Sequence, residues 1–84
     1  MFQIRGIDHI VLRIKSREQS LAFYCDQLGC QLEREVEEIG LIQLRAGNCL
    51  IDLVPIGGKL GSAGGKAPGA EGRNLDHLCL RIEK

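Results

Sequence analysis

Hydrophobic and polar residues alternate along residues 7–14, which spell IDHIVLRI. Consecutive side chains of a strand point to opposite faces. The pattern therefore predicts a strand within residues 4–14 that has one apolar face and one mixed face. The apolar face consists of Ile10, Leu12 and Ile14. The mixed face carries His9, Val11 and Arg13.

A helical period follows this strand. Ser16 is a good N-cap, and Gln19, three residues later, completes a capping box. One apolar stripe then recurs at the i, i+3, i+4 and i+7 positions of a helix, at Leu21, Tyr24, Cys25 and Leu28. Gly29 stands where a left-handed residue commonly ends a helix. These signals predict a helix over residues 17–28.

Alternation returns after the helix and predicts three more strands, over residues 31–38, 41–47 and 49–56. In the first of them, Leu32 and Val36 are expected to point inward. Turn signals at Gly40 and at Gly47-Asn48 separate the strands, and the second is typical of a tight hairpin. Pro55 has no backbone N–H to donate to a ladder and should end the last strand.

Residues 57–73 contain seven glycines and predict a flexible connector with no helix or strand of its own. A phosphate-binding loop is a weak alternative. The pattern G-x-x-x-x-G-K-[ST] is missing, because Gly65-Lys66 is followed by Ala67.

The first octad is repeated near the end of the sequence. Residues 75–82 spell LDHLCLRI, which shares five of eight residues with the octad 68 positions earlier. Internal repeats indicate repeated structural units. We therefore expect a complete βαβββ unit over residues 1–56, the connector over 57–73, and the first strand of an incomplete second unit over 74–84.

Composition narrows the functional classes. Eleven basic and eleven acidic residues give a net charge of zero, so no basic surface indicates nucleic-acid binding. No apolar run approaches the length of a membrane span, and no leader pattern follows Met1, so we expect a cytoplasmic protein without membrane contact. The four cysteines form no C-x-x-C pair, which favours reduced, packed thiols over disulfides or zinc.

The two octads, the Ser-capped helix ending in AFYCDQLG and the strand LIDLV together resemble the vicinal oxygen chelate superfamily. That superfamily includes glyoxalase I, extradiol dioxygenases, and fosfomycin and bleomycin resistance proteins. The resemblance covers nearly the whole chain. It implies an α+β fold in which two βαβββ units, each with a mixed sheet, pair edge to edge into one open, cupped sheet. A divalent metal ion binds in the cup.

The resemblance also implies a set of ligands. His9, Asp52 and His77 match three metal-binding positions of the superfamily, and Asp52 would also be the catalytic carboxylate. The fourth ligand, a glutamate near the end of the second unit, has no counterpart in this sequence. Strand alternation independently places all three side chains away from the helix. Two imidazoles and a carboxylate suit Zn, Ni, Fe or Mn and leave positions for substrate oxygens.

Alternatives stay open at each of these positions. A strand histidine can be an ordinary hydrogen-bonded residue, and Asp52, shorter than glutamate, can act through water. Arg13 and Arg81 lie four residues after each histidine and could hold an anionic substrate, or could instead pair with Glu35 or Glu37. The aspartates before the histidines, Asp8 and Asp76, are expected to face away from them as strand-start hydrogen-bond acceptors.

Two functional classes follow. In an enzyme, the metal would act as a Lewis acid on two oxygens of a small substrate and stabilise an enediolate or a similar anion while a carboxylate moved the proton. The full-length form would then be lactoylglutathione lyase-like or dioxygenase-like. In a resistance-type module, the cup would hold a small ligand without chemistry. An inactive fragment is a third possibility.

The repeat also predicts a partner. The resemblance implies that the first strand of the unit is an open sheet edge, because the superfamily uses that edge to join the second unit, and open edges tend to pair with another chain. A second copy could complete the cup through an isologous homodimer interface, with His9 and Asp52 of both chains at one centre.

Overall fold

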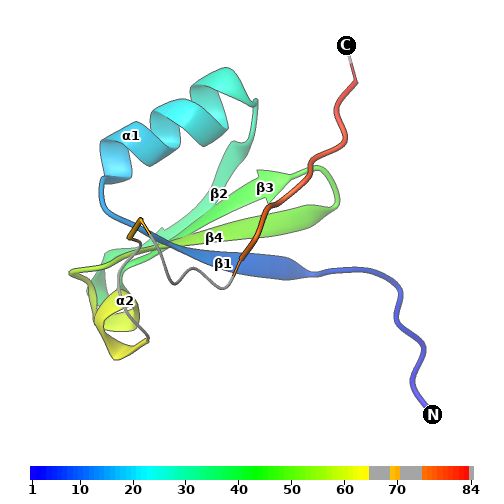
Figure 1. Cartoon of the computed structure of the whole chain (residues 1–84), viewed down its shortest axis with the longest axis horizontal. Helices are drawn as coiled ribbons and strands as arrows, with labels where there is room; N and C mark the ends of the chain where they lie inside the picture. The colour runs from blue at the N-terminus through cyan, green and yellow to red at the C-terminus, as the bar shows by residue number, and fades with distance from the viewer. Residues whose placement is uncertain (65–68, 71–74, 84) are drawn as a thin grey trace.

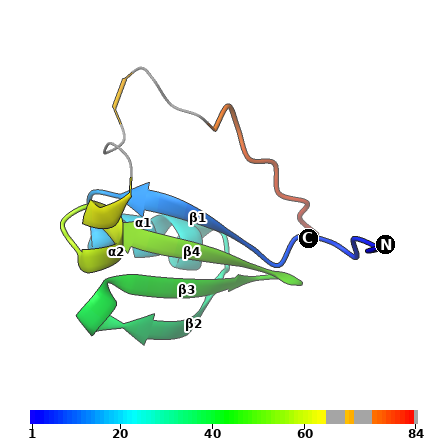
Figure 2. The same cartoon turned by 90° about the horizontal axis from the view of Figure 1, so that it is seen from below.

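The computed structural model describes residues 1–64, 69–70 and 75–83. Along the chain the elements are β1 (His9–Ile14), α1 (Arg17–Leu21), the π-helical η1 (Ala22–Gln27), β2 (Gln31–Val36), the 3-10 turn η2 (Glu37–Ile39), β3 (Leu41–Ala46), β4 (Cys49–Pro55) and α2 (Lys59–Ala63). The sheet order is β1-β4-β3-β2, with β1 parallel to β4 and the other pairs antiparallel (Figure 2). The predicted α+β, βαβββ fold with a mixed sheet is confirmed.

The helix over residues 17–27 begins and ends as the sequence predicts. The Ser16 hydroxyl accepts a hydrogen bond from the Gln19 backbone N–H at 3.1 Å. From Ala22 onward the turns widen to π geometry. Gly29 then takes a φ of 83°, which lets the chain reverse so that the Cys30 N–H reaches the Tyr24 carbonyl at 2.9 Å. This continuous helix covers one face of the sheet (Figure 1), here called the helix face. The opposite face is called the cup face.

The core lies between the helix and the helix face. Leu44 and Leu53 are fully buried there, with Ile42 and Ile51 almost so. The apolar side of the first octad joins this core, and the helix contributes Leu21, Tyr24 and Cys25. The octad's predicted apolar face is therefore confirmed.

The predicted inward direction of β2 side chains holds for Leu32, which pairs with Leu44 on the helix face, and is wrong for Val36. A register shift between Leu32 and Arg34 moves the rest of the strand to the opposite alternation. Val36 consequently pairs with Leu41, on the cup face, while Glu35 turns to the helix face. Leu32 lies ahead of the shift, at the sheet edge, and is 50% exposed.

The expectation that the glycine-rich connector holds no helix is wrong over Lys59–Ala63, which form α2. The Gly58 N–H donates to the Pro55 carbonyl at 2.9 Å, and the Ser62 N–H donates to the Gly58 carbonyl at 2.9 Å. Gly61 makes this packing possible, because a Cβ there would lie 2.0 Å from the Pro55 oxygen. Residues 65–68 and 71–73 of the predicted connector lie outside the described residues.

Both ends of the chain extend from this body. The first strand begins at His9 rather than near residue 4, and residues 1–7 are exposed. Residues 75–83 form no strand in the single chain, although β1 has a free edge. A strand requires a neighbouring strand to pair with. The predicted first strand of a second unit therefore stays a prediction, and so does the division of the chain into one complete and one incomplete unit.

Candidate functional site

A buried acid lies at the centre of the cup face. Asp52 of β4 sits between Val11 of β1 and Gln43 of β3 in the sheet register, and it is only 5% exposed. Its Oδ2 accepts a hydrogen bond from the Gln43 side-chain amide at 3.3 Å. Its Oδ1 is buried and has no hydrogen-bond partner among the described residues. An unsatisfied buried carboxylate oxygen is costly, so it indicates a missing ligand or a functional role.

His9 approaches the same carboxylate from the neighbouring strand. Its Nε2 lies 4.0 Å from Asp52 Oδ2, and its Nδ1 lies 2.8 Å from Asp8 Oδ1. The hydrogen bond to Asp8, and then the negative charge of Asp52, raise the pKa of His9. Metal-binding histidines are commonly oriented in this way, with a carboxylate on one ring nitrogen and the other nitrogen free for the metal.

The expectation that Asp8 and Asp76 face away from the histidines is wrong. Each carboxylate instead folds back onto the next residue, and the Asp76 Oδ1 lies 2.8 Å from Nδ1 of His77. Both pairs are exposed, so nothing prevents the short side chain from turning. The predicted role as a hydrogen-bond acceptor is kept, with the histidine ring as donor.

The predicted ligands come together only in part. His9 and Asp52 lie 4.0 Å apart on the cup face, as Nε2 to Oδ2, and imidazole nitrogens and carboxylate oxygens are both common metal ligands. His77 is exposed on the C-terminal segment and does not join them. Within residues 1–64, 69–70 and 75–83, no group of three or more His, Cys, Asp and Glu side chains is arranged to hold a metal ion. Of the three predicted ligands, the described chain thus brings only His9 and Asp52 near each other.

Arg13 lies on the cup face, but its partner was not foreseen. Its Nε donates to the Gly61 carbonyl of α2 at 3.2 Å, and its guanidinium fills the space that a Cβ on Gly64 would need. Glu35, the alternative partner, is held by Arg17 through two hydrogen bonds of 2.9 and 2.8 Å. The other predicted arginine, Arg81, lines a cavity on the helix face in the single chain.

Sequence reasoning missed Gln43 as the hydrogen-bond partner of Asp52. The alternation of β3 did contain a signal, because Gln43 lies between the two core residues Ile42 and Leu44 and must face the cup. Its position directly opposite Asp52 follows only from the register of β3 against β4.

Residues 6–84 match a family model described as Glyoxalase/Bleomycin resistance protein/Dioxygenase superfamily. No curated protein matches the chain. Among the described residues, no helix has the length and apolar character needed to cross a membrane.

Proposed function

The chain belongs to the glyoxalase/bleomycin resistance protein/dioxygenase superfamily, and from this we propose that its cup face is one part of a divalent-metal site acting on two neighbouring oxygens of a small substrate. The observation that carries the proposal is the carboxylate of Asp52. It is buried, one oxygen lacks a hydrogen-bond partner among the described residues, and the other lies 4.0 Å from Nε2 of His9.

The chain's own residues have distinct tasks in this proposal. His9 and Asp52 would hold the metal, which supplies Lewis-acid polarisation of substrate oxygens when bound. Asp8 orients the imidazole through its contact at Nδ1. Gln43 holds Oδ2 of Asp52, which leaves Oδ1 free to bind the metal or to accept a proton from the substrate. Arg13, at the end of the cup beside α2, would attract an anionic group of the substrate.

A second copy of the chain is the proposed source of the missing donors. The free edge of β1 lies beside the cup face, and an exposed edge can add a strand from another chain. A two-fold dimer through β1 would supply another His9 and Asp52. Alternatively, the octad 75–82 could pair with this edge, which would bring His77 and Arg81 to the cup.

Metal titration tests the site. Zinc or nickel is added to the wild type, to His9→Ala and to His77→Ala, with binding followed by calorimetry. We expect His9→Ala to lose at least about tenfold in affinity, the effect known for removing groups that hold or orient a metal. If His77→Ala also binds the metal more weakly, residues 75–82 are the source of the missing donors. If His77→Ala keeps the wild-type affinity, the two-fold dimer is their source. Equal affinity in the wild type and His9→Ala would reject the site.

The assembly has its own test. In a parallel pair the backbone groups of alternate residues point to the same side, and the Asp8 carbonyl accepts a bond from Leu50 of β4 while the Ile14 carbonyl accepts one from Ile56, directly after β4. The Val11 N–H therefore points to the free edge. We expect a dimer by sedimentation at micromolar concentration, lost in Val11→Pro and kept in Val11→Thr. A folded wild-type monomer would refute it.

A non-catalytic binding module is the second candidate. It is favoured by the apolar side chains beside the two donors: Val11, on the cup face, is 54% exposed, and Val54 lies on the same face. Metal content separates the two candidates. Stoichiometric metal together with turnover of a test substrate, such as the hemithioacetal of glutathione and methylglyoxal, would support the enzyme. Ligand binding without metal would support the module.

A further inference from the structure

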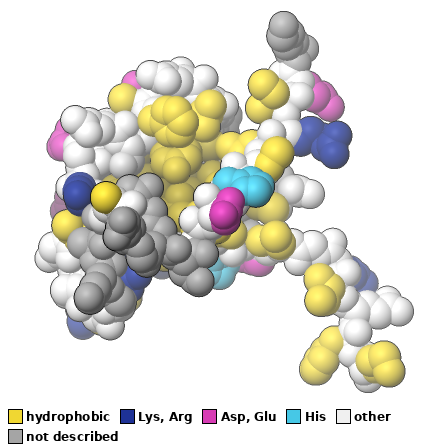
Figure 3. Space-filling model, viewed as in Figure 1, with side chains coloured by type: hydrophobic (Ala, Val, Ile, Leu, Met, Phe, Trp, Pro, Cys, Tyr) yellow, Lys and Arg dark blue, Asp and Glu magenta, His cyan; other side chains and the backbone are white. Residues whose placement is uncertain are grey.

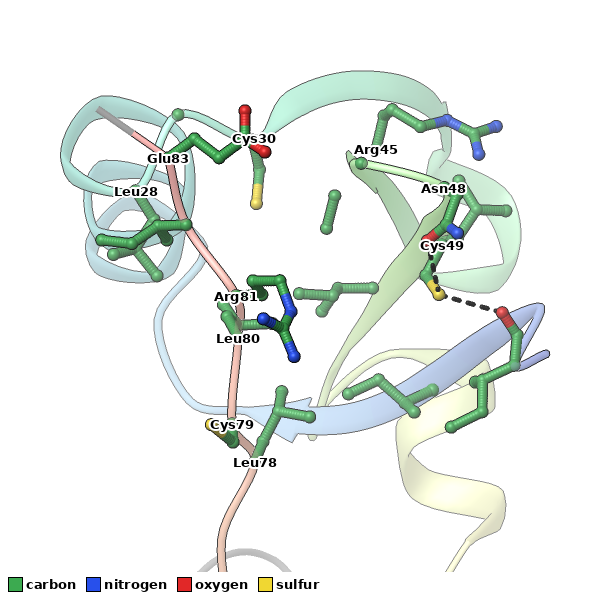
Figure 4. A pocket seen from close by; sticks show the side chains of 18 residues that line it. Leu28, Cys30, Arg45, Asn48, Cys49, Leu78, Cys79, Leu80, Arg81 and Glu83 are labelled. Atoms are coloured by element: carbon green, nitrogen blue, oxygen red, sulfur yellow. Dashed lines mark hydrogen bonds between the residues drawn. The ribbon is translucent and has the colours of Figure 1, made fainter.

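A second concave site lies on the helix face. It is a cavity of about 640 Å³ between the sheet, the end of the helix and residues 78–83 (Figures 3 and 4). The apolar side chains that line it include Ile10, Ile51, Leu28, Cys30, Leu78 and Leu80. Figure 3 shows this hydrophobic surface between α1 and the C-terminal segment.

This cavity is separate from the candidate metal site. Ile10 and Ile51 point to the helix face, whereas His9 and Asp52 point to the cup face of the same two strands. Neither His9 nor Asp52 lines the cavity. A ligand here would therefore be held by the opposite side of the sheet from the metal.

One cation in the cavity lacks an anionic partner. Arg81 projects from the C-terminal segment toward the middle of the cavity (Figure 4). It makes no hydrogen bond or ion pair with any other part of the chain that the structure describes. The other arginine of the lining, Arg45, is already paired with Glu33, at 3.3 and 3.4 Å. The one acid of the lining, Glu83, lies toward the Cys30 end of the cavity (Figure 4).

We propose that this cavity binds a small apolar carboxylate, such as a medium-chain fatty acid or an aryl acid. A guanidinium matches a carboxylate in a bidentate geometry, and the apolar floor suits a hydrocarbon chain. The cavity volume falls within the usual range for small-molecule sites. Such a ligand would bridge Arg81 to the floor at Ile10 and Ile51, and so hold residues 78–83 on the helix face and away from the β1 edge. The proposal does not depend on the metal site.

Decanoate, below its micelle-forming concentration, is the probe for an NMR titration of the whole chain. We expect amide shifts at Gly47 and at Leu80, with Val11 and Gln43 of the cup face unchanged. Arg81→Met should bind decanoate about tenfold more weakly, since a charge-assisted hydrogen bond is lost. Arg34→Met is the matched control, because Arg34 is exposed on β2 and does not line the cavity, and it should bind like the wild type.

Two further measurements exclude simpler explanations. Glu83→Gln should bind decanoate more tightly, because a like charge is removed from the lining. Decanol, which has no charge, should bind the wild type and Arg81→Met equally. The proposal is overturned if shifts are confined to the cup face, or if Arg81→Met, shown to be folded by its own spectrum, keeps the wild-type affinity for decanoate.

Discussion

The imidazole of His9 and the carboxylate of Asp52 face each other across the parallel β1–β4 pair, with 4.0 Å between Nε2 and Oδ2. This separation is too long for a hydrogen bond. In the proposed site both groups would hold the metal ion, because imidazole nitrogens and carboxylate oxygens are common metal ligands.

Replacing Asp52 by asparagine separates metal binding from folding. Asp52→Asn keeps the shape of the side chain and removes its negative charge. Oδ1 of the carboxylate is buried and has no hydrogen-bond partner among the described residues. We expect metal affinity to fall at least about tenfold while the melting temperature stays the same or rises, because a buried carboxylate with one unsatisfied oxygen is replaced by a neutral amide. Calorimetric metal titration and thermal unfolding check the two parts. Undiminished metal binding in the variant would remove Asp52 from the site.

The packing of α2 against β4 depends on Gly61. A Cβ at this position would lie 2.0 Å from the Pro55 oxygen, so we expect Gly61→Ala to destabilise the protein by about 1–3 kcal/mol, as overpacking generally does. The hydrogen bond from Arg13 Nε to the Gly61 carbonyl should be lost with it. Gly57→Ala is the control, because no atom lies within 4 Å of its added Cβ. Denaturant unfolding of both variants, with the Arg13 Nε–H followed by NMR, is the measurement; equal stability of the two would contradict the packing.

Two leucines on the same face of the sheet, one on the edge strand β2 and one on the central strand β3, should differ sharply in their tolerance of truncation. Leu44 is fully buried, whereas Leu32, its partner in the ladder, is 50% exposed. Leu44→Ala should cost about 2–5 kcal/mol, a large part of the stability of a domain this size. Leu32→Ala should cost less than about 1 kcal/mol. Urea unfolding monitored by circular dichroism compares them, and similar losses would show that the edge of the sheet is buried in solution.

An exposed ion pair links the start of the helix to the edge strand. The Arg17 guanidinium donates to both oxygens of Glu35 and lowers the pKa of that carboxyl below its ordinary value. A lowered pKa contributes stability above the ordinary glutamate pKa, and this is lost as the pH falls through the pKa of the folded state. We therefore expect Arg17→Met to raise the Glu35 pKa in an NMR titration. Compared with the wild type, Arg17→Met should melt at a lower temperature at about pH 7 and at the same temperature at about pH 3.

The control for this pair is Arg5→Met, because Arg5 lies in the exposed N-terminal segment. It should leave the pKa of Glu35 unchanged. An unchanged Glu35 pKa in Arg17→Met itself would show that the pair does not persist in solution.

Much of the fold could be predicted because it is encoded in short stretches of sequence. The alternation of the octad assigns Ile10 to the helix face and His9 to the cup face, since the strand period is fixed by backbone geometry. The Ser16 cap, the turn at Gly29 and the hairpin at Gly47 likewise depend only on neighbouring residues. The βαβββ order followed from these local patterns, and the family from the resemblance of the two octads, the capped helix and the strand LIDLV to a known superfamily.

Relationships between distant segments were decided only by the tertiary structure. The bulge between Leu32 and Arg34, which reverses the faces of β2, is set by the pairing of two strands rather than by either sequence. The contact of Asp52 with Gln43 likewise depends on the register of β3 against β4. The Gly61 carbonyl accepts a hydrogen bond from Arg13 because α2 folds over the end of β4. The glycines of this stretch disfavour a helix, so the sequence did not predict α2. Alternation tells which way a side chain points. What it meets there depends on contacts between residues far apart in the chain, which no local pattern contains.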